Sequence, residues 1–213
     1  MENLRKIGKE YGKYKLEFKK VDKNPIEQFK KWLDEAITAD VLEPTSMILS
    51  TSTLDGKPSS RALLLKEIFD NTFCFFTNYQ SKKGKQIAVN PYGSLLFFWP
   101  DFERQVTMEG EIKQLSKEKS DEYFKTRPEQ SKIGAWASPQ SSVIPNKKYI
   151  ENIQKDFEKR FVRIPVIKPP HWGGYQFIPI SIEFWQGRPN RLHDRILFTK
   201  EKNGEWKKEL LAP

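Results

Sequence analysis

The stretch from residue 46 to residue 115 constrains the fold more than any other part of the sequence. It contains five short apolar or β-branched segments, which read MILSTST, PSSRALLLK, FCFFT, SLLFFW and RQVTMEGEIKQL. Turn-forming pairs lie between three sets of neighbouring segments: Asp55-Gly56, Asp70-Asn71 and Pro100-Asp101. Strands joined by such short turns pair antiparallel, so the stretch predicts an antiparallel barrel or sandwich, with a bulge at Gly110.

Helix signals flank and interrupt these strands. Four residues are suited to cap a helix N-terminus, namely Asn24, Ser81, Ser116 and Asn146. From Tyr175 to the end the chain returns to strand-type sequence. The fold class predicted is therefore mainly β with flanking helices. We expect a mobile, Lys- and Glu-rich arm over residues 1–23 and a single domain with peripheral helices over residues 24–213.

Charge and cysteine content narrow the possible partners and surroundings. The chain carries 37 Lys and Arg against 28 Asp and Glu, a formal net charge of +9, which favours anionic partners. The single cysteine, Cys74, cannot form a disulfide within the chain, as is usual in a reducing compartment. No apolar run approaches the roughly 18 residues needed to span a membrane, and the N-terminus lacks an apolar signal core. We therefore expect a cytoplasmic protein without a membrane partner.

The segment ISIEFWQGRPNRLHDRILF, residues 180–198, contains the densest group of candidate site residues. Gly187, Pro189 and Asn190 predict a turn between two strands. If the second strand begins directly after the turn, then Arg191, His193 and Arg195 project to one side of it. With Trp185 as a flat wall, the segment predicts a pocket for a planar anion. An exposed edge strand with solvated charges explains the pattern equally well.

Two further basic groups could bind anions. Lys82 and Lys83 lie in the first turn of the helix expected after Ser81, where backbone amides attract an anion; a solvated loop is the alternative. Tyr123 and Arg127 are four residues apart and share a helix face. Ser131 follows four residues later, if the helix resumes after Pro128. Together these side chains could hold a phosphate, or they could be ordinary polar residues of a surface helix.

Several kinds of chemistry find no support in the sequence. There is no Walker loop, no GxGxxG and no GxSxG motif. The two histidines, His171 and His193, lack metal-ligand spacing to Cys74, so no metal site is expected. A nucleic-acid-binding barrel would alternate aromatics with basic residues on an exposed sheet, whereas these aromatics gather in apolar runs. The separated basic groups fit two phosphorylated ligands, or one ligand and a cofactor.

The motifs EFWQG at residues 183–187 and RLHDR at residues 191–195 resemble the C-terminal signature of pyridoxamine 5′-phosphate oxidases. Further matches follow in family order: RALLLK from Arg61, FFTN from Phe75, ERQV from Glu103, YFKTRP from Tyr123, IGAWAS from Ile133 and QSS from Gln140. The resemblance spans nearly everything from residue 24 onwards. It implies an antiparallel FMN-binding split β-barrel that works as a homodimer, with a flavin in each of two sites at the subunit interface.

The resemblance also implies roles for individual residues. Those expected to bind FMN are Arg61, Ala62, Leu63, Leu64, Leu65, Lys66, Phe76, Thr77, Lys82, Lys83, Gln105, Gln140, Ser141, Trp185 and Arg195. Those expected to bind the substrate are Lys66, Tyr123, Arg127, Ser131, Arg191, Leu192 and His193. Within this set, Arg191 and His193 are expected to orient and polarise the pyridine ring, which makes them the catalytic candidates.

The implied reaction converts pyridoxamine or pyridoxine 5′-phosphate into pyridoxal 5′-phosphate. Hydride passes to FMN, and O2 then reoxidises the flavin and yields H2O2. Two departures from the family pattern matter: Lys82 replaces a common arginine, and Gly8 replaces the basic residue that precedes Tyr11 in an arm of some relatives. The alternative implied by the same resemblance is a split-barrel flavin-binding protein with a different substrate or no oxidase activity.

Overall fold

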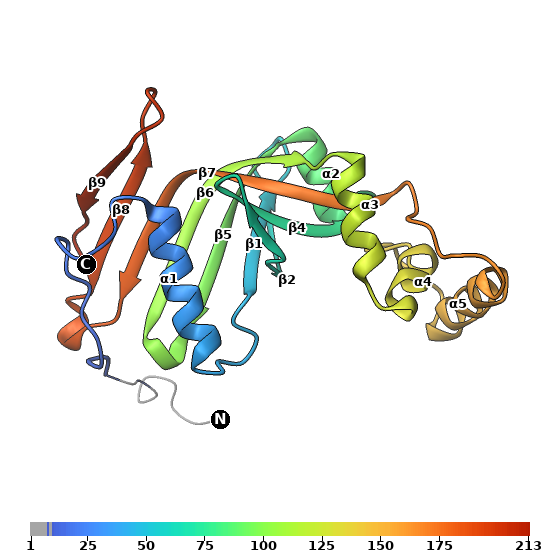
Figure 1. Ribbon diagram of the computed structural model, residues 1–213, viewed down its shortest axis with the longest axis horizontal. Coiled ribbons are helices and arrows are strands. Elements are labelled where there is room, and N and C mark those ends of the chain that lie inside the picture. The colour runs from blue at the N-terminus through green and yellow to red at the C-terminus, as the bar shows by residue number, and fades with distance from the viewer. Residues whose placement is uncertain (1–7, 9) are drawn as a thin grey trace.

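The computed structural model describes residue 8 and residues 10–213 (Figure 1). Its helices are α1 (Pro25–Thr38), α2 (Lys82–Val89), α3 (Lys117–Thr126), α4 (Glu129–Ala137) and α5 (Lys147–Phe161), with short 3-10 helices η2 (Pro100–Phe102) and η3 (Pro189–Arg191). Its strands are β1 (Ser46–Ser52), β2 (Pro58–Leu64), β3 (Glu67–Phe69), β4 (Thr72–Asn78), β5 (Tyr92–Trp99), β6 (Arg104–Gln114), β7 (Trp172–Gln186), β8 (Asp194–Lys200) and β9 (Trp206–Leu210).

All the described strands belong to one curled antiparallel sheet, which confirms the predicted fold class. The order is β2-β1-β5-β6-β7-β4-β3, and β8 and β9 extend the sheet from β7. Strand β7 connects the two ends: residues 172–177 pair with β4, and residues 181–186 pair with β8. Figure 1 shows β7 running from the end beside α3 to the end where β8 and β9 lie.

The turns and the bulge follow from local sequence. Asp70 and Asn71 both adopt left-handed backbone angles, with φ of 47° and 58°, between β3 and β4. Asp and Asn tolerate that conformation better than most residues, because their short polar side chains can bond locally. The β6–β7 register shifts at Gly110, as predicted, and a Cβ there would lie 2.2 Å from the Ile178 carbonyl oxygen. Only glycine permits that approach.

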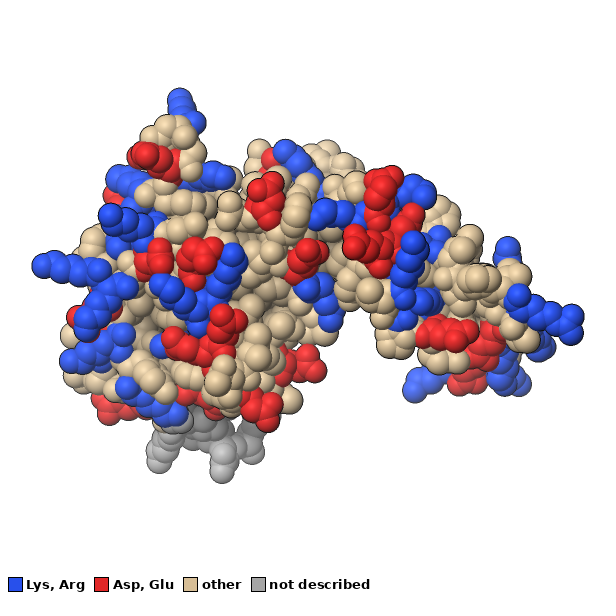
Figure 2. All heavy atoms as spheres, viewed as in Figure 1, with Lys and Arg blue, Asp and Glu red and all other residues tan. Residues whose placement is uncertain are grey.

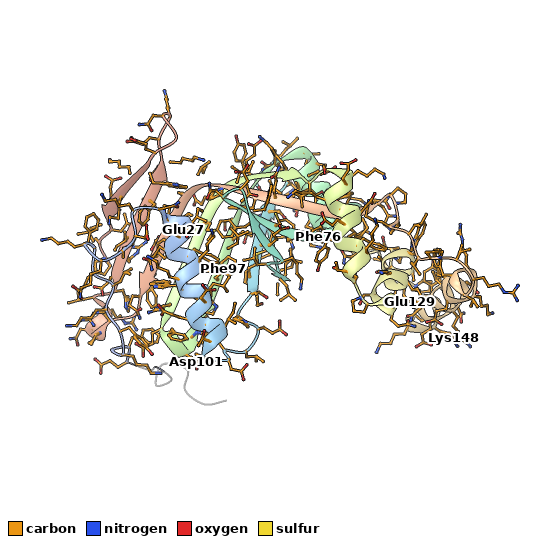
Figure 3. All side chains as sticks on the ribbon, viewed as in Figure 1. Glu27, Phe76, Phe97, Asp101, Glu129 and Lys148 are labelled. Carbon is orange, nitrogen blue, oxygen red and sulfur yellow. The ribbon has the colours of Figure 1, made fainter. Side chains whose placement is uncertain are left out.

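An aromatic core joins α1 to the concave side of the sheet. Asn24 caps α1 by accepting from the Ile26 N–H, and the helix buries its apolar face. Phe29, which is fully buried, contacts Phe73 and Phe97 with ring centroids 5.0 and 4.7 Å apart. Figure 3 labels Phe97 beside α1 and Phe76 farther along the sheet, toward α3. Phe97 belongs to the core cluster of buried residues, and Phe76 does not.

The described part of the N-terminal arm lies against the β8 side of the sheet. The backbone N–H groups of Gly12 and Lys13 donate to the Glu103 carboxylate at 2.8 and 3.1 Å, and the Leu16 N–H donates to Asp194 at 3.0 Å. Residues 1–7 and 9 lie outside the described residues. The mobility expected for residues 1–23 stays a prediction.

Helices α4 and α5 project beyond the sheet on the side of α3 (Figure 1). Over the described residues, no helix combines the length and apolar character that crossing a bilayer requires. The same residues contain no group of three or more His, Cys, Asp or Glu side chains able to hold a metal ion. Figure 2 shows basic and acidic side chains intermixed on one face, so the net charge is not gathered into a single basic stripe there.

Candidate functional site

Two cations meet where β2 approaches the start of α2. Lys83, 7% exposed, directs its Nζ at three neutral oxygens: Thr77 Oγ1 at 3.2 Å, Ser81 Oγ at 3.4 Å and Gln140 Oε1 at 3.1 Å. Burial, together with repulsion from Arg61, lowers the pKa of Lys83 to about 8. We call Arg61, Thr77, Lys83 and Gln140 the cationic cradle. Two adjacent cations without a carboxylate partner among the described residues favour binding of an anion.

Arg61 is held in the cradle by hydroxyl groups. Its guanidinium donates to the Thr51 and Ser59 hydroxyls, both at 2.6 Å, and to the Leu49 carbonyl at 3.2 Å. Neither Thr51 nor Ser59 was a predicted site residue. Ser59 could have been found from the sequence, because its i, i+2 spacing from Arg61 on one strand places both side chains on the same face. Lys82, in contrast, is exposed at the first position of α2.

A second cationic site lies beside the cradle, built on aromatic rings. Phe76 stacks on Tyr123 with centroids 3.7 Å apart, and the Arg127 guanidinium lies 4.5 Å from the centroid of Trp172. We call Phe76, Tyr123, Arg127 and Trp172 the aromatic grip. Arg127 Nη1 is buried and has no hydrogen-bond partner among the described residues. A buried donor of this kind is costly unless a ligand accepts from it.

The remaining predicted residues of this end differ in placement. Helix α4 begins at Glu129 and contains Ser131, but Arg127 and Pro128 before it are extended, so the helical spacing from Arg127 to Ser131 is interrupted. Lys66 lines another hollow, together with Lys30 and Leu33 of α1. Of the other five, Ala62 and Ser141 are exposed, Leu63 and Leu64 are half-buried, and Leu65 is buried. Strand β2 ends at Leu64, so Lys66 lies beyond the strand that carries Arg61.

A third group of predicted residues lies at the opposite end of β7. Trp185 pairs with Arg195 of β8 and with Gln105 of β6, and its ring lies 4.5 Å from that of His193. We call Trp185, His193 and Arg195 the platform. Glu183 binds Arg195 through both carboxylate oxygens, at 2.7 and 3.1 Å, and this hydrogen bonding raises the pKa of Arg195. A cavity of about 530 Å³ adjoins the platform, lined by Gly8, Glu10, Tyr11, Arg188, Asn190, Arg191 and His193.

The strand position predicted for Arg191 and His193 is wrong. Strand β8 begins at Asp194, and Arg191 lies in η3 with a φ of 61°. The turn is longer than expected because Asn190 also adopts a left-handed conformation, with a φ of 56°. Arg191 is therefore carried by a turn, and His193 reaches Trp185 from the segment before the strand. Leu192, between them, is 67% exposed.

One protomer does not bring all these groups together. The cradle and the grip share the first end of β7, because Thr77 pairs with Gly173 and Phe76 with Gly174. The platform lies at the other end, on Trp185. Strand β7 has 15 residues. At roughly 3.3 Å of rise for each residue, Trp172 and Trp185 lie roughly 40 Å apart along the strand. Within one protomer the cradle and the platform therefore lie at different ends of β7, and Figure 1 shows those two ends apart.

Comparisons with known families match both ends of the chain. Residues 33–155 match the family model described as pyridoxamine 5′-phosphate oxidase. Residues 172–213 match a model described as the C-terminal dimerisation region of pyridoxine 5′-phosphate oxidase, which supports a homodimer. This second match contains β7, β8 and β9, and thus the platform.

Two relatives illustrate the similarity in sequence. A pyridoxine/pyridoxamine 5′-phosphate oxidase from Actinobacillus pleuropneumoniae serotype 3 (strain JL03) is 50% identical over 212 residues, covering 99% of this chain and 100% of the relative. One from Nostoc punctiforme (strain ATCC 29133 / PCC 73102) is 46% identical over 207 residues, covering 97% of each chain.

Two solved structures are similar in fold. PhzG from Burkholderia lata 383, in complex with tetrahydrophenazine-1-carboxylic acid, matches with a TM-score of 0.88 and 28% identity, covering 95% of this chain and 100% of PhzG. A pyridoxamine 5′-phosphate oxidase-related, FMN-binding protein from Nostoc punctiforme PCC 73102 matches with a TM-score of 0.71 and 17% identity, covering 87% and 97%. These likenesses confirm the predicted split-barrel architecture.

Proposed function

The chain belongs to the pyridoxamine 5′-phosphate oxidase family, and from this premise we propose that it oxidises pyridoxamine or pyridoxine 5′-phosphate to pyridoxal 5′-phosphate with FMN as its cofactor. The observation that carries the proposal is the pair of anion sites at one end of β7. The cradle has two cations without an acidic partner among the described residues, and the neighbouring grip has an unpaired donor on Arg127. Two phosphates, one from the cofactor and one from the substrate, satisfy both sites.

FMN fits the residues of the cradle and the platform only if two protomers share each site. Arg61 and Lys83 would hold the phosphate, and Trp185 and Arg195 would contact the flavin from the other end of a strand. Because roughly 40 Å of β7 separates those ends in one protomer, a single flavin cannot reach both. In a homodimer, the cradle of one subunit can face the platform of its partner, and the two-fold symmetry creates two equal sites.

The substrate would be held at both of its ends. Tyr123, Arg127 and Ser131 would bind the phosphate, while Arg191 and His193 would orient the pyridine ring; Lys66 and Leu192 complete the proposed set. When bound, FMN supplies the two-electron acceptor for the hydride, and O2 restores it with release of H2O2. The contribution of the chain is to fix the two ring systems in a reactive orientation and to place positive charge beside them.

The decisive experiment is an aerobic assay of the purified protein. We expect a yellow protein that releases FMN on denaturation. It should convert pyridoxamine 5′-phosphate, O2 and water into pyridoxal 5′-phosphate, ammonia and H2O2. A protein that neither contains FMN nor can be reconstituted with it would contradict the proposal. The similarity to PhzG favours one second candidate, oxidation of a tricyclic carboxylate that has no phosphate. Turnover of such a compound, without turnover of pyridoxamine 5′-phosphate, would establish that candidate instead.

Arg127→Met distinguishes the two candidates in a second way. For a phosphorylated substrate, the loss of a charge-assisted contact worth about 1.5–3 kcal/mol should raise KM about 10- to 150-fold. The KM for unphosphorylated pyridoxamine, measured in parallel, should change little. An equal increase for both compounds would show that Arg127 does not bind the phosphate. Lys125→Met, an exposed change in the last turn of α3, two residues before Arg127, is the matched control.

The lowered pKa of Lys83 predicts a pH dependence of FMN binding. The free protein loses the Lys83 proton near pH 8, and binding of a phosphate requires its return. Above pH 8 the affinity should therefore fall by up to about tenfold for each pH unit. Titrations of apoprotein with FMN between pH 7 and pH 9.5 would measure this slope. Lys83→Met should bind weakly at every pH and lack the slope; an unchanged slope would contradict the assignment.

A further inference from the structure

A series of hydrogen bonds connects Arg61 of the cradle to Gln86 of helix α2. The hydroxyls of Thr51 and Ser59, each of which accepts from Arg61, both donate to one atom, Oε1 of Gln86, at 2.7 Å. Gln86 is 5% exposed and Thr51 is 3% exposed. Three elements thus converge on one buried carbonyl: β1 through Thr51, β2 through Ser59 and α2 through Gln86.

The direction of every hydrogen bond in this chain is fixed by chemistry. Arginine can only donate, so the two hydroxyls must accept from Arg61. Their own protons are then free to bond elsewhere, and the carbonyl oxygen of Gln86 accepts both. An apolar side chain at position 86 would leave both hydroxyls free to rotate and to donate in other directions. Gln86 therefore holds two hydroxyl groups as acceptors for one guanidinium.

This arrangement leaves one edge of the Arg61 guanidinium available. Of its five N–H groups, both on Nη1 are used by Leu49 and Thr51, and one on Nη2 is used by Ser59. Because Thr51 and Ser59 share an acceptor atom, they lie together at the Nη1–Nη2 end of the group. Among the described residues the Nε–H and the second Nη2–H have no partner, and these two lie parallel on the side edge. Parallel donors of this kind match two oxygens of a phosphate.

We propose that Gln86 is a positioning residue for the cofactor phosphate, and this inference rests on the proposed binding of FMN in the cradle. Gln86 acts through Thr51 and Ser59, and sets which edge of Arg61 meets the ligand. Helix α2 carries Lys83 one turn before Gln86, so the same helix places one cation directly and orients the other. The energetic effect should be confined to ligands that bear the phosphate.

The test compares FMN with riboflavin, which lacks only the phosphate, on apoprotein. Gln86→Leu removes the acceptor with little change of volume and should weaken FMN binding about tenfold or more, while riboflavin binding changes less than about threefold. Gln28→Leu is the matched control, because Gln28 is also buried on a helix and bonds through Oε1, there to the Asp22 N–H. It should leave the FMN-to-riboflavin affinity ratio unchanged.

A double-mutant cycle gives the second readout. Once Arg61→Ala has removed the guanidinium, Gln86→Leu should no longer alter the FMN-to-riboflavin ratio. If Gln86→Leu does not fold, Ser59→Ala breaks the same chain at its half-buried end and should lower the ratio about threefold or more. If the wild type binds FMN and these variants keep its FMN-to-riboflavin affinity ratio, the proposed role of Gln86 is overturned. Absence of FMN binding in the wild type would instead overturn the proposed function.

Discussion

Replacing Arg61 and Lys83 together by methionine should lower FMN affinity about a thousandfold. Each cation would contribute a charge-assisted contact of about 1.5–3 kcal/mol to the phosphate, and 1.4 kcal/mol corresponds to a factor of ten. Both side chains lie in the same cradle and neither has an acidic partner among the described residues, so their removal takes two uncompensated positive charges from it. Fluorescence titration of the apoprotein with FMN, where binding quenches the flavin, would measure the loss.

The same double variant should not unfold the protein. Burial lowers the pKa of both Arg61 and Lys83, which means that the folded protein disfavours their charged forms. Below pH 8, removal of these charges should leave the Tm of the apoprotein unchanged or raise it. The matched control is Lys85→Met, an exposed lysine of the same helix, which should retain FMN. Retention of FMN within about tenfold by the double variant would contradict the cradle.

Local features of the fold could be predicted from the sequence because their causes are local. The cap residues Asn24, Ser81, Ser116 and Asn146 each accept a backbone N–H at the start of a helix, as their side chains predict. The bulge at Gly110 and the left-handed turn at Asp70-Asn71 follow from residue types that permit them. Strand β3 was missed, because three residues are too few to show an alternating pattern.

The candidate site was less accessible to such reasoning, because it depends on distant parts of the chain. Trp172 was not among the predicted site residues, yet it begins β7 and its ring lies 4.5 Å from the Arg127 guanidinium. Gln86 could not be related to Arg61 from spacing, since their link passes through Thr51 of a third element. The resemblance named the residues of the cradle and the platform together. Only the length of β7 reveals that one protomer keeps them apart.

That separation makes a prediction about mixed dimers. One variant would carry Arg61→Met and Lys83→Met in the cradle, and a second would carry Trp185→Leu and Arg195→Met in the platform. Homodimers of either variant should have two defective sites and almost no activity. In a mixed dimer, one site contains both the defective cradle and the defective platform. The other site receives an intact cradle from one subunit and an intact platform from its partner.

The measurement is the oxidation of pyridoxamine 5′-phosphate by the two variants after they are co-expressed with different affinity tags. Random pairing should restore about a quarter of the wild-type activity, and dimers purified through both tags should have about half. Activity that remains at the level of the separate variants, in dimers shown to carry both tags, would mean that each site is built within one subunit and would contradict the account.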